Sequence, residues 1–268
     1  MKHILYVVGT GPGDMSHMSK RAVDVISGAN SVAGYSTYIE LIRELIPDKK
    51  IISTGMMKEV ERVEMALEEA MNAGSCALIS GGDPGVYAMA GLVFEICREK
   101  RIPLSRPDAD EESIKDSTDS TQCLRLEIVP GIPALAAGAS LVGAPLTHDF
   151  AAISLSDLLT PWEVIEKRLT YAAQADFVIV LYNPKSKKRD WQLKRACDIL
   201  LDLRSKDTPV GIVTGAMREN QSVTISCLKD LENETIDMQT VVFIGSTASL
   251  AYLDYMYTPR GYLNKYGL

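Results

Sequence analysis

The chain has 268 residues, of which 46% are hydrophobic and 24% are charged, and it carries a net charge of −7 with a pI near 5.1. This composition is typical of a globular protein with one large domain or two smaller ones. The acidic balance disfavours binding to nucleic acid or to an anionic membrane, and no run approaches the ~18 apolar residues of a membrane span. We therefore expect a cytoplasmic protein without a nucleic-acid or membrane partner.

The five cysteines are far apart and include no Cys-x-x-Cys pair: Cys76, Cys97, Cys123, Cys197 and Cys227. This spacing is typical of free thiols in a reducing compartment and does not match a disulfide framework, a zinc site or an iron–sulfur cluster. We expect no protein-bound metal and no iron–sulfur cluster.

Short β-branched runs that end in Gly or Pro turns alternate with helical patterns along the chain. The runs predicted to form strands are residues 3–8, 76–80, 126–129, 177–182, 210–214 and 241–244. Their continuous apolar character indicates strands that are covered on both faces. Apolar residues at helical spacing predict helices around residues 60–71, 164–172 and 193–201. Strands that alternate with helices indicate an α/β fold.

Residues 106–122 form a polar and acidic segment that is nearly free of apolar side chains. Such a segment cannot bury enough surface to offset the entropy lost on ordering, so we expect a mobile surface loop. We place a domain boundary shortly after it, which divides the chain into domains 1–127 and 128–268.

A glycine-rich turn, GTGPGD at residues 9–14, directly follows the first predicted strand. A dinucleotide-binding loop would need a third glycine where Asp14 stands, and no GxxxxGK[ST] phosphate loop occurs in the chain. A nicotinamide-dependent dehydrogenase is therefore a disfavoured alternative.

A second turn, SGGDPGVY at residues 80–87, follows the strand at 76–80. Asp83 and Pro84 suit the start of a helix, as its cap and its first residue. Gly81 and Gly82 leave open backbone at the carboxyl end of a buried strand, where α/β folds bind ligands.

A third turn, VPGIPA at residues 129–134, leads into a helix of small residues. Close helix packing explains these small residues, and a ligand lying against the helix is the alternative. Together, GTGPGD, SGGDPGVY and VPGIPA resemble the tetrapyrrole (corrin/porphyrin) methylases over nearly the whole chain. The resemblance implies a two-domain α/β fold, each domain a mixed sheet flanked by helices, with the active site in the cleft between the domains. It also implies S-adenosylmethionine as methyl donor, a tetrapyrrole substrate and a homodimer.

Three further segments are similar to the precorrin-3B C17-methyltransferase branch of this family: residues 145–162, 181–186 and 215–219. This similarity implies methylation of C17 of precorrin-3B or cobalt-precorrin-3, with ring contraction, in cobalamin biosynthesis. Methylation of another corrin carbon, C11 or C20, stays open, and diphthine synthases and rRNA 2′-O-methyltransferases are more distant branches. A binding module that holds a tetrapyrrole or nucleotide without turnover is the alternative from another class.

The resemblance also implies which residues bind the cofactor. They are Pro12, Gly81, Gly82, Asp83, Val86, Pro133, Ala134, Tyr182, Asn183, Gly215 and Ala216. Pro133 takes the place of a threonine or serine in related enzymes, so its contact would be apolar or through its carbonyl.

Three residues are candidates for catalysis: Tyr35, His148 and Asp149. Tyr35 falls where some relatives have a catalytic aspartate, but a tyrosine is a weaker base, so it could instead orient or stack on the substrate, or be simply half-buried. A histidine can exchange protons near neutral pH, and Asp149 adjoins His148. Lys185, Lys187, Lys188 and Arg189 form either a solvated helix start or a clamp for substrate carboxylates.

Overall fold

The computed structural model describes residues 3–109, 123–186 and 189–267, and contacts divide the chain into two compact units, Met1–Pro133 and Ala134–Leu268. The domain boundary expected from the sequence, between residues 127 and 128, lies slightly earlier. The division falls after β6 (Leu124–Val129) because this strand pairs with β1 (Ile4–Gly9) as far as Val129. Residues 110–122 of the predicted polar loop lie outside the described residues.

The first unit contains a six-stranded sheet of order β3-β2-β4-β1-β6-β5. The other strands are β2 (Ser31–Tyr35), β3 (Lys50–Thr54), β4 (Ser75–Ser80) and β5 (Leu104–Ser105). All its neighbouring strands pair in parallel, so the prediction of a mixed sheet is wrong for this unit. Helices carry the chain back across the sheet between strands, which keeps the strands in one direction.

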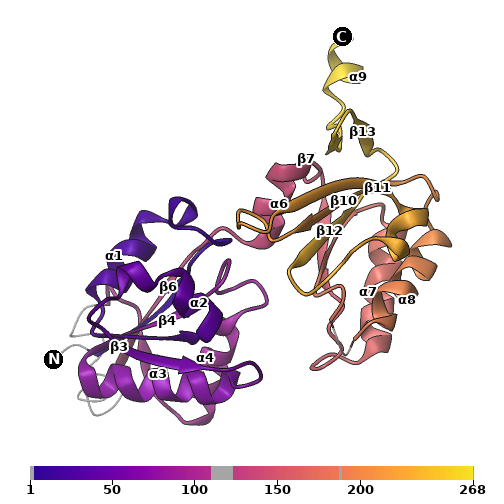
Figure 1. The fold of residues 1–268 in the computed structure, drawn as a ribbon. Coiled ribbons are helices and arrows are strands. Elements are labelled where there is room, and N and C mark those ends of the chain that lie inside the picture. The colour runs from indigo at the N-terminus through magenta and orange to yellow at the C-terminus, as the bar shows by residue number, and fades with distance from the viewer. Residues whose placement is uncertain (1–2, 110–122, 187–188, 268) are drawn as a thin grey trace. The chain divides into compact units, whose positions relative to one another are not determined.

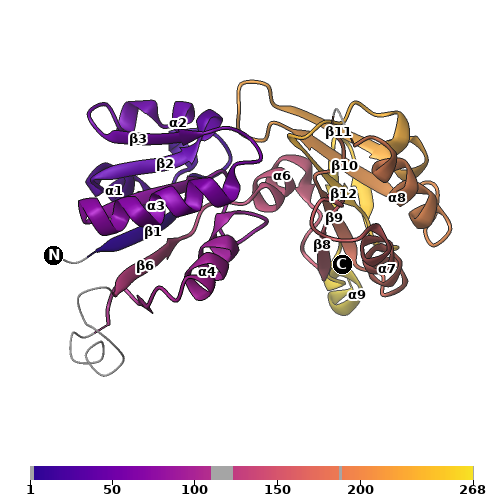
Figure 2. The same cartoon turned by 90° about the horizontal axis from the view of Figure 1, so that it is seen from below.

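Helices cover both faces of this sheet, as Figures 1 and 2 show. One face carries α1 (Lys20–Gly28), α2 (Ser36–Leu41) and the short 3-10 turn η2 (Arg43–Leu45). The other carries α3 (Glu59–Ala73) and α4 (Met89–Glu99). Buried Val, Leu and Ile side chains pack on both faces, which explains the continuous apolar runs in the sequence.

The second unit contains a five-stranded sheet of order β11-β10-β12-β9-β8. Its strands are β8 (Phe150–Ser154), β9 (Val178–Tyr182), β10 (Pro209–Thr214), β11 (Ser222–Cys227) and β12 (Thr240–Ile244). The β8–β9 pair is parallel, and the other pairs are antiparallel, so this sheet is mixed as predicted.

One face of the second sheet packs against α7 (Trp162–Gln174), α8 (Trp191–Leu201) and the 3-10 helix η3 (Leu228–Asn233). The other face packs against α6 (Ala134–Val142). A small sheet of order β13-β14-β7 and the helix α9 complete the unit (Figure 1). Their bounds are β7 (Gly143–Ala144), β13 (Leu250–Tyr252), β14 (Tyr255–Tyr257) and α9 (Tyr262–Tyr266).

All five cysteines are free thiols, and two of them have strongly raised pKa values. Burial raises the pKa of Cys76 in β4 to about 11 and that of Cys197 in α8 to about 12. Among residues 3–109, 123–186 and 189–267, no group of three or more His, Cys, Asp or Glu side chains could hold a metal ion. None of the described helices is both long and apolar enough to span a membrane.

Candidate cofactor and substrate site

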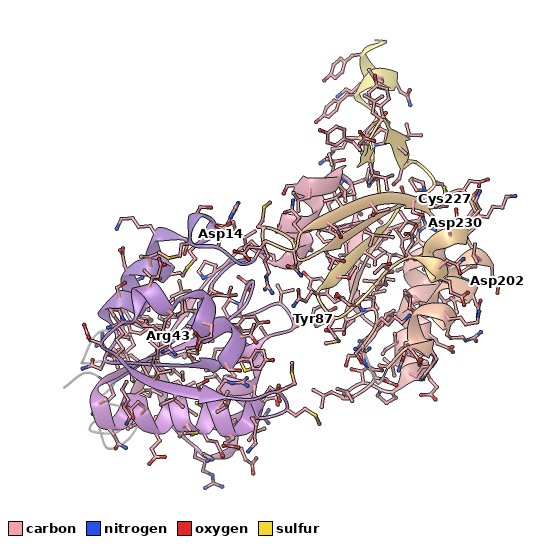
Figure 3. All side chains as sticks on the ribbon, in the orientation of Figure 1. Asp14, Arg43, Tyr87, Asp202, Cys227 and Asp230 are labelled. Carbon is pink, nitrogen blue, oxygen red and sulfur yellow. The ribbon has the colours of Figure 1, made fainter. Side chains whose placement is uncertain are left out.

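The carboxyl ends of the parallel strands in the first unit meet at one edge of the sheet, which we call the first carboxyl edge. The three glycine turns follow β1, β4 and β6 here, and Tyr35 ends β2 at the same edge. Asp14 and Tyr87, both labelled in Figure 3, belong to the loops after β1 and β4. The sequence-predicted cofactor residues of this unit and Tyr35 therefore belong to one edge.

The glycine turns touch through their backbones. Gly11 N donates to Gly82 O at 3.1 Å, and Gly82 N donates to Gly11 O at 2.7 Å. A Cβ atom on Gly131 would lie 2.1 Å from Gly82 O, and one on Gly9 would lie 2.5 Å from the same oxygen. Gly9 and Gly131 are thus required by contact between loops, before any ligand is considered.

Asp83 joins the second and third turns. Its Oδ1 accepts from Gly85 N at 2.8 Å, and its Oδ2 accepts from Gly131 N at 3.1 Å. The prediction that Asp83 and Pro84 start a helix is wrong, because α4 begins only at Met89. The carboxylate instead holds the second and third turns together.

Asp14 closes the first turn as the cap of the 3-10 turn η1 (Met15–His17). Its Oδ1 accepts from Ser16 Oγ at 2.6 Å and from His17 N at 3.1 Å. The hydrogen bond from Ser16, followed by those from His17, lowers the pKa of this carboxyl. Asp14, which stands where a dinucleotide-binding loop would have its third glycine, therefore stabilises the conformation of this loop.

Ser80 supplies an observation that fits a bound polar ligand at this edge. Its side chain is buried, and its hydroxyl has no hydrogen-bond partner among the residues that the structure describes. Buried polar atoms are normally paired, so this hydroxyl has unused bonding capacity next to Gly81 and Gly82. Pro12 is buried beside these turns and Val86 is half-buried. The residues present are compatible with a cofactor held by backbone groups and small side chains.

Tyr35 lies in an aromatic cluster with a buried cation. Its ring meets Tyr38 edge-on at 5.6 Å, and the Arg62 guanidinium lies 5.9 Å from its centroid. Arg62 donates to Thr54 Oγ1 at 2.7 Å and to Gly55 O at 2.9 Å, and burial lowers its pKa. Arg62 was not predicted from the sequence, although an arginine on the apolar side of a predicted helix is a signal that could have identified it.

The second unit has a corresponding edge, which we call the second carboxyl edge. β10 and β9 are both antiparallel to β12, so β8, β9 and β10 end on the same side of the sheet. Tyr182 and Asn183 follow β9, and Gly215 and Ala216 follow β10. Four of the predicted cofactor residues are thus placed along one edge.

Tyr182 also connects this edge to the start of α6. Its hydroxyl accepts from Leu135 N at 2.8 Å, in the first turn of the helix that begins at Ala134. The structure therefore brings together the predicted residues Ala134 and Tyr182. Pro133 is the last residue of the first unit, and its side chain is half-buried.

The loops at the second carboxyl edge begin with left-handed residues. Asn183 has a φ of 50°, and its Nδ2 donates to Ser154 Oγ at 3.0 Å. Gly215 has a φ of 57°, and a Cβ atom there would lie 2.5 Å from Asn220 Oδ1. Left-handed backbone in a non-glycine residue is uncommon and gathers at functional sites.

His148 and Asp149 lie at the other end of β8. Asp149 O accepts from Val178 N at 3.1 Å, at the amino end of β9. The strand between has five residues, so about 16 Å separates this pair from the loop after Ser154. Both side chains are exposed, with His148 Nδ1 and Asp149 Oδ2 3.4 Å apart. The structure does not bring them together with Tyr182 and Asn183.

The basic residues after β9 do not all lie exposed on the surface, as a clamp for substrate carboxylates would require. Arg189 is buried, with 8% of its surface exposed, and Lys185 is half-buried. Lys187 and Lys188 lie outside the described residues. The guanidinium of Arg189 donates to backbone carbonyls, so it is not presented to a substrate carboxylate.

Residues 4–232 match the family model of the tetrapyrrole (corrin/porphyrin) methylases. The chain is 47% identical over 268 residues to the "Cobalt-factor III methyltransferase" of Priestia megaterium, and spans 47% of that protein's length. It is 41% identical over 259 residues to the "Probable cobalt-factor III C(17)-methyltransferase" of Salmonella typhimurium, covering 97% of this chain and 99% of that protein.

Among solved structures, the chain is similar to the crystal structure of the methyltransferase CobJ. The TM-score is 0.82 with 32% sequence identity, over 97% of this chain and 100% of that chain. The predicted α/β fold and the resemblance stated from the sequence motifs are confirmed.

Proposed function

The chain belongs to the tetrapyrrole (corrin/porphyrin) methylases, and we propose that it methylates C17 of cobalt-factor III with S-adenosylmethionine as methyl donor. The observation that carries this proposal is the first carboxyl edge, where three glycine turns touch beside the Ser80 hydroxyl, which has no hydrogen-bond partner within the described part of the chain. The choice of substrate is supported by the names of the Priestia and Salmonella relatives, both of which refer to cobalt-factor III.

We propose that both carboxyl edges contribute to cofactor binding. In the first unit the residues are Pro12, Gly81, Gly82 and Val86, with Asp83 holding the loops. In the second they are Ala134, Tyr182, Asn183, Gly215 and Ala216, with Pro133 preceding them. Bound S-adenosylmethionine would supply a methyl group on a sulfonium, whose carbon–sulfur electron pair returns to sulfur when the methyl carbon bonds to C17. The residues of the chain serve mainly to position the reactants and to exclude water.

Of the three predicted catalytic residues, only Tyr35 lies on the edge that carries the glycine turns. We propose that its ring contacts the tetrapyrrole, because Tyr38 and Arg62 fix the ring from its other sides. The exposed positions of His148 and Asp149, at the opposite end of β8, give no support to a catalytic role.

We further propose that the protein is a cytoplasmic homodimer, with the C-terminal segment from β13 to α9 in the interface. β13 is the edge strand of its small sheet, and unpaired edges favour association. The segment carries large exposed apolar side chains: Leu250, Tyr252, Leu253, Tyr255, Tyr262, Leu263 and Tyr266. If this is correct, the double substitution Tyr252→Ser and Leu253→Ser lowers the mass measured by light scattering to that of one chain.

The test of function is anaerobic incubation of the purified protein with S-adenosylmethionine and, in parallel, cobalt-factor III or precorrin-3B. We expect cobalt-factor III to gain the mass of one methylene, and a 13C-labelled methyl group to appear at C17 by NMR. If only precorrin-3B reacts, the substrate is the metal-free tetrapyrrole and the assignment of cobalt-factor III is wrong. A label at C11 or C20 would contradict the C17 assignment. Binding of S-adenosylmethionine without any turnover would favour a non-catalytic module.

A further inference from the structure

Arg189 is buried where two loops of the second carboxyl edge meet. Its Nη1 donates to Leu155 O at 3.0 Å and to Asn183 O at 3.0 Å, and its Nη2 contacts Met238 Sδ at 3.6 Å. Leu155 directly follows β8, and Asn183 directly follows β9. One guanidinium nitrogen thus joins the ends of two neighbouring strands.

The backbone of Asn183 is constrained from several sides. It has the left-handed φ of 50°, its carbonyl accepts from Arg189, and its side chain donates to Ser154 Oγ. The same Ser154 hydroxyl accepts from Ser156 N at 3.2 Å, and Leu155 N donates to Tyr182 O at 2.9 Å. A left-handed residue that is not glycine persists only where its surroundings hold it in place.

Burial disfavours the charge of Arg189, because a guanidinium loses hydration when it leaves water. This burial lowers the pKa of Arg189, and the nearby charge of Asp157 acts in the opposite direction. The two oxygens that it contacts are backbone carbonyls and not carboxylates. A buried cation that binds two loop carbonyls is well suited to fix the geometry of those loops.

We propose that Arg189 is a positioning residue, which fixes the carbonyls of Leu155 and Asn183 and so holds Asn183 in the conformation that binds S-adenosylmethionine. This inference rests on the proposed cofactor role of Asn183. It replaces the hypothesis that Arg189 clamps a substrate carboxylate, because Arg189 is directed into the protein.

The second unit contains a matched control at the other end of the same strand. Arg204 is also buried, and it donates to Gly245 O at 2.7 Å and to Phe177 O at 2.8 Å. Phe177 precedes β9, so Arg189 and Arg204 hold the two opposite ends of this strand. Arg204 also pairs with Asp176 at 3.0 Å, and burial lowers its pKa as it does for Arg189.

The experiment compares Arg189→Lys with Arg204→Lys in the full chain. A lysine keeps the charge but cannot bind two carbonyls in the fixed geometry of a guanidinium. We expect both variants to be less stable, and only Arg189→Lys to weaken S-adenosylmethionine binding, by about 10- to 100-fold in calorimetry. Its KM for S-adenosylmethionine should rise correspondingly, while that of Arg204→Lys stays close to wild type.

Hydrogen exchange supplies a readout that does not depend on the cofactor. We expect Arg189→Lys to speed amide exchange in the segments 154–157 and 182–186, and Arg204→Lys to speed it around Phe177 and Gly245. Unchanged exchange at 154–157 and 182–186 in Arg189→Lys would overturn the positioning role. Equal losses of cofactor affinity in the two variants would overturn its specific link to binding. If the wild type binds no S-adenosylmethionine, the proposed function fails, and the link to the cofactor fails with it.

Discussion

The two units of this protein bring loops together at the carboxyl ends of their strands by different means. In the first unit the loops after β1, β4 and β6 meet backbone to backbone, through Gly9, Gly82 and Gly131. In the second unit a backbone hydrogen bond from Leu155 N to Tyr182 O is supplemented by side chains, which run from Arg189 and Tyr182 to backbone groups.

Strand order alone does not explain this difference, because β8 and β9 in the second unit are also parallel neighbours. β4, β1 and β6 are parallel neighbours, so their loops leave the sheet about 4.8 Å apart, and only glycine leaves room for three backbones. In the second unit the antiparallel β12 separates β9 from β10, so their carboxyl ends are about 10 Å apart. The ends of adjacent parallel strands can therefore be joined by glycine backbones, as in the first unit, or by a buried side chain, as Arg189 joins the ends of β8 and β9.

The largest effect that would test this comparison is expected for Gly131→Ala. The new Cβ would lie 2.1 Å from Gly82 O, so the loops must separate, and we expect a loss of about 3 kcal/mol in the free energy of unfolding. Chemical denaturation measures this free energy of unfolding, and calorimetry measures the affinity for S-adenosylmethionine. Gly91→Ala is the control, because its added Cβ would meet no described atom within 4 Å outside its own turn of α4, and it should stabilise α4 by about 0.5–1 kcal/mol. Equal stability of the two variants would contradict the backbone-contact model.

The next effect is expected for Asp83→Ala. This change removes both oxygens that accept from Gly85 and Gly131, and we expect it to cost about 2 kcal/mol in unfolding free energy. Asp83→Asn keeps one acceptor oxygen and should lose about half as much. If the alanine variant is as stable as wild type, the side chain does not join the two turns, and the first unit depends on glycine alone.

The buried thiols Cys76, in the first unit, and Cys197, in the second, allow the pH dependence of stability to be compared between the two units. The pKa values of Cys76 and Cys197 are raised in the folded state, so the thiols ionise first in the unfolded chain, near pH 9. Stability is therefore complete below pH 9 and falls as the pH rises toward about 11 for Cys76 and about 12 for Cys197. The expected slope is roughly 1.4 kcal/mol per pH unit for each thiol. Urea unfolding between pH 8 and 11 should show a shallower slope in Cys197→Ala, and an identical slope would refute this.

Tyr182→Phe should have a smaller effect. It removes only the oxygen that accepts from Leu135 N, so we expect a loss of about 1 kcal/mol in unfolding free energy. Tyr171→Phe is the control, because Tyr171 is exposed on α7 and keeps its ring for the contact with Lys167. If both substitutions are neutral, the tyrosine hydroxyl does not help to hold the second unit's loops.

The smallest effect is expected for His148→Asn. Its side chain is exposed at the amino end of β8, away from the second carboxyl edge, so kcat should change by less than about twofold. Steady-state methylation assays at several pH values provide the measurement. A loss of about 100-fold or more would restore the catalytic assignment made from the sequence.

Much of the fold could be predicted from the sequence, because many of the buried strands are continuous apolar runs. The six predicted strands correspond to β1, β4, β6, β9, β10 and β12, and three predicted helices correspond to α3, α7 and α8. The strands β2, β3 and β8 were missed because serine, glycine, lysine or alanine interrupts their apolar pattern. β11 was missed because its side chains are half-buried or exposed, so it lacks a strong apolar signal.

The sequence by itself determined the α/β class, the three glycine turns and the family, because turn residues and apolar runs are local features of the chain. Only the tertiary structure decided that the first sheet is all parallel, that Asp83 joins two loops, and that Arg62 and Arg189 are buried. It also placed Tyr35 with the glycine turns and His148 at the opposite end of β8 from the second carboxyl edge. These facts depend on contacts between residues far apart in the chain, and no local pattern specifies which strands become neighbours.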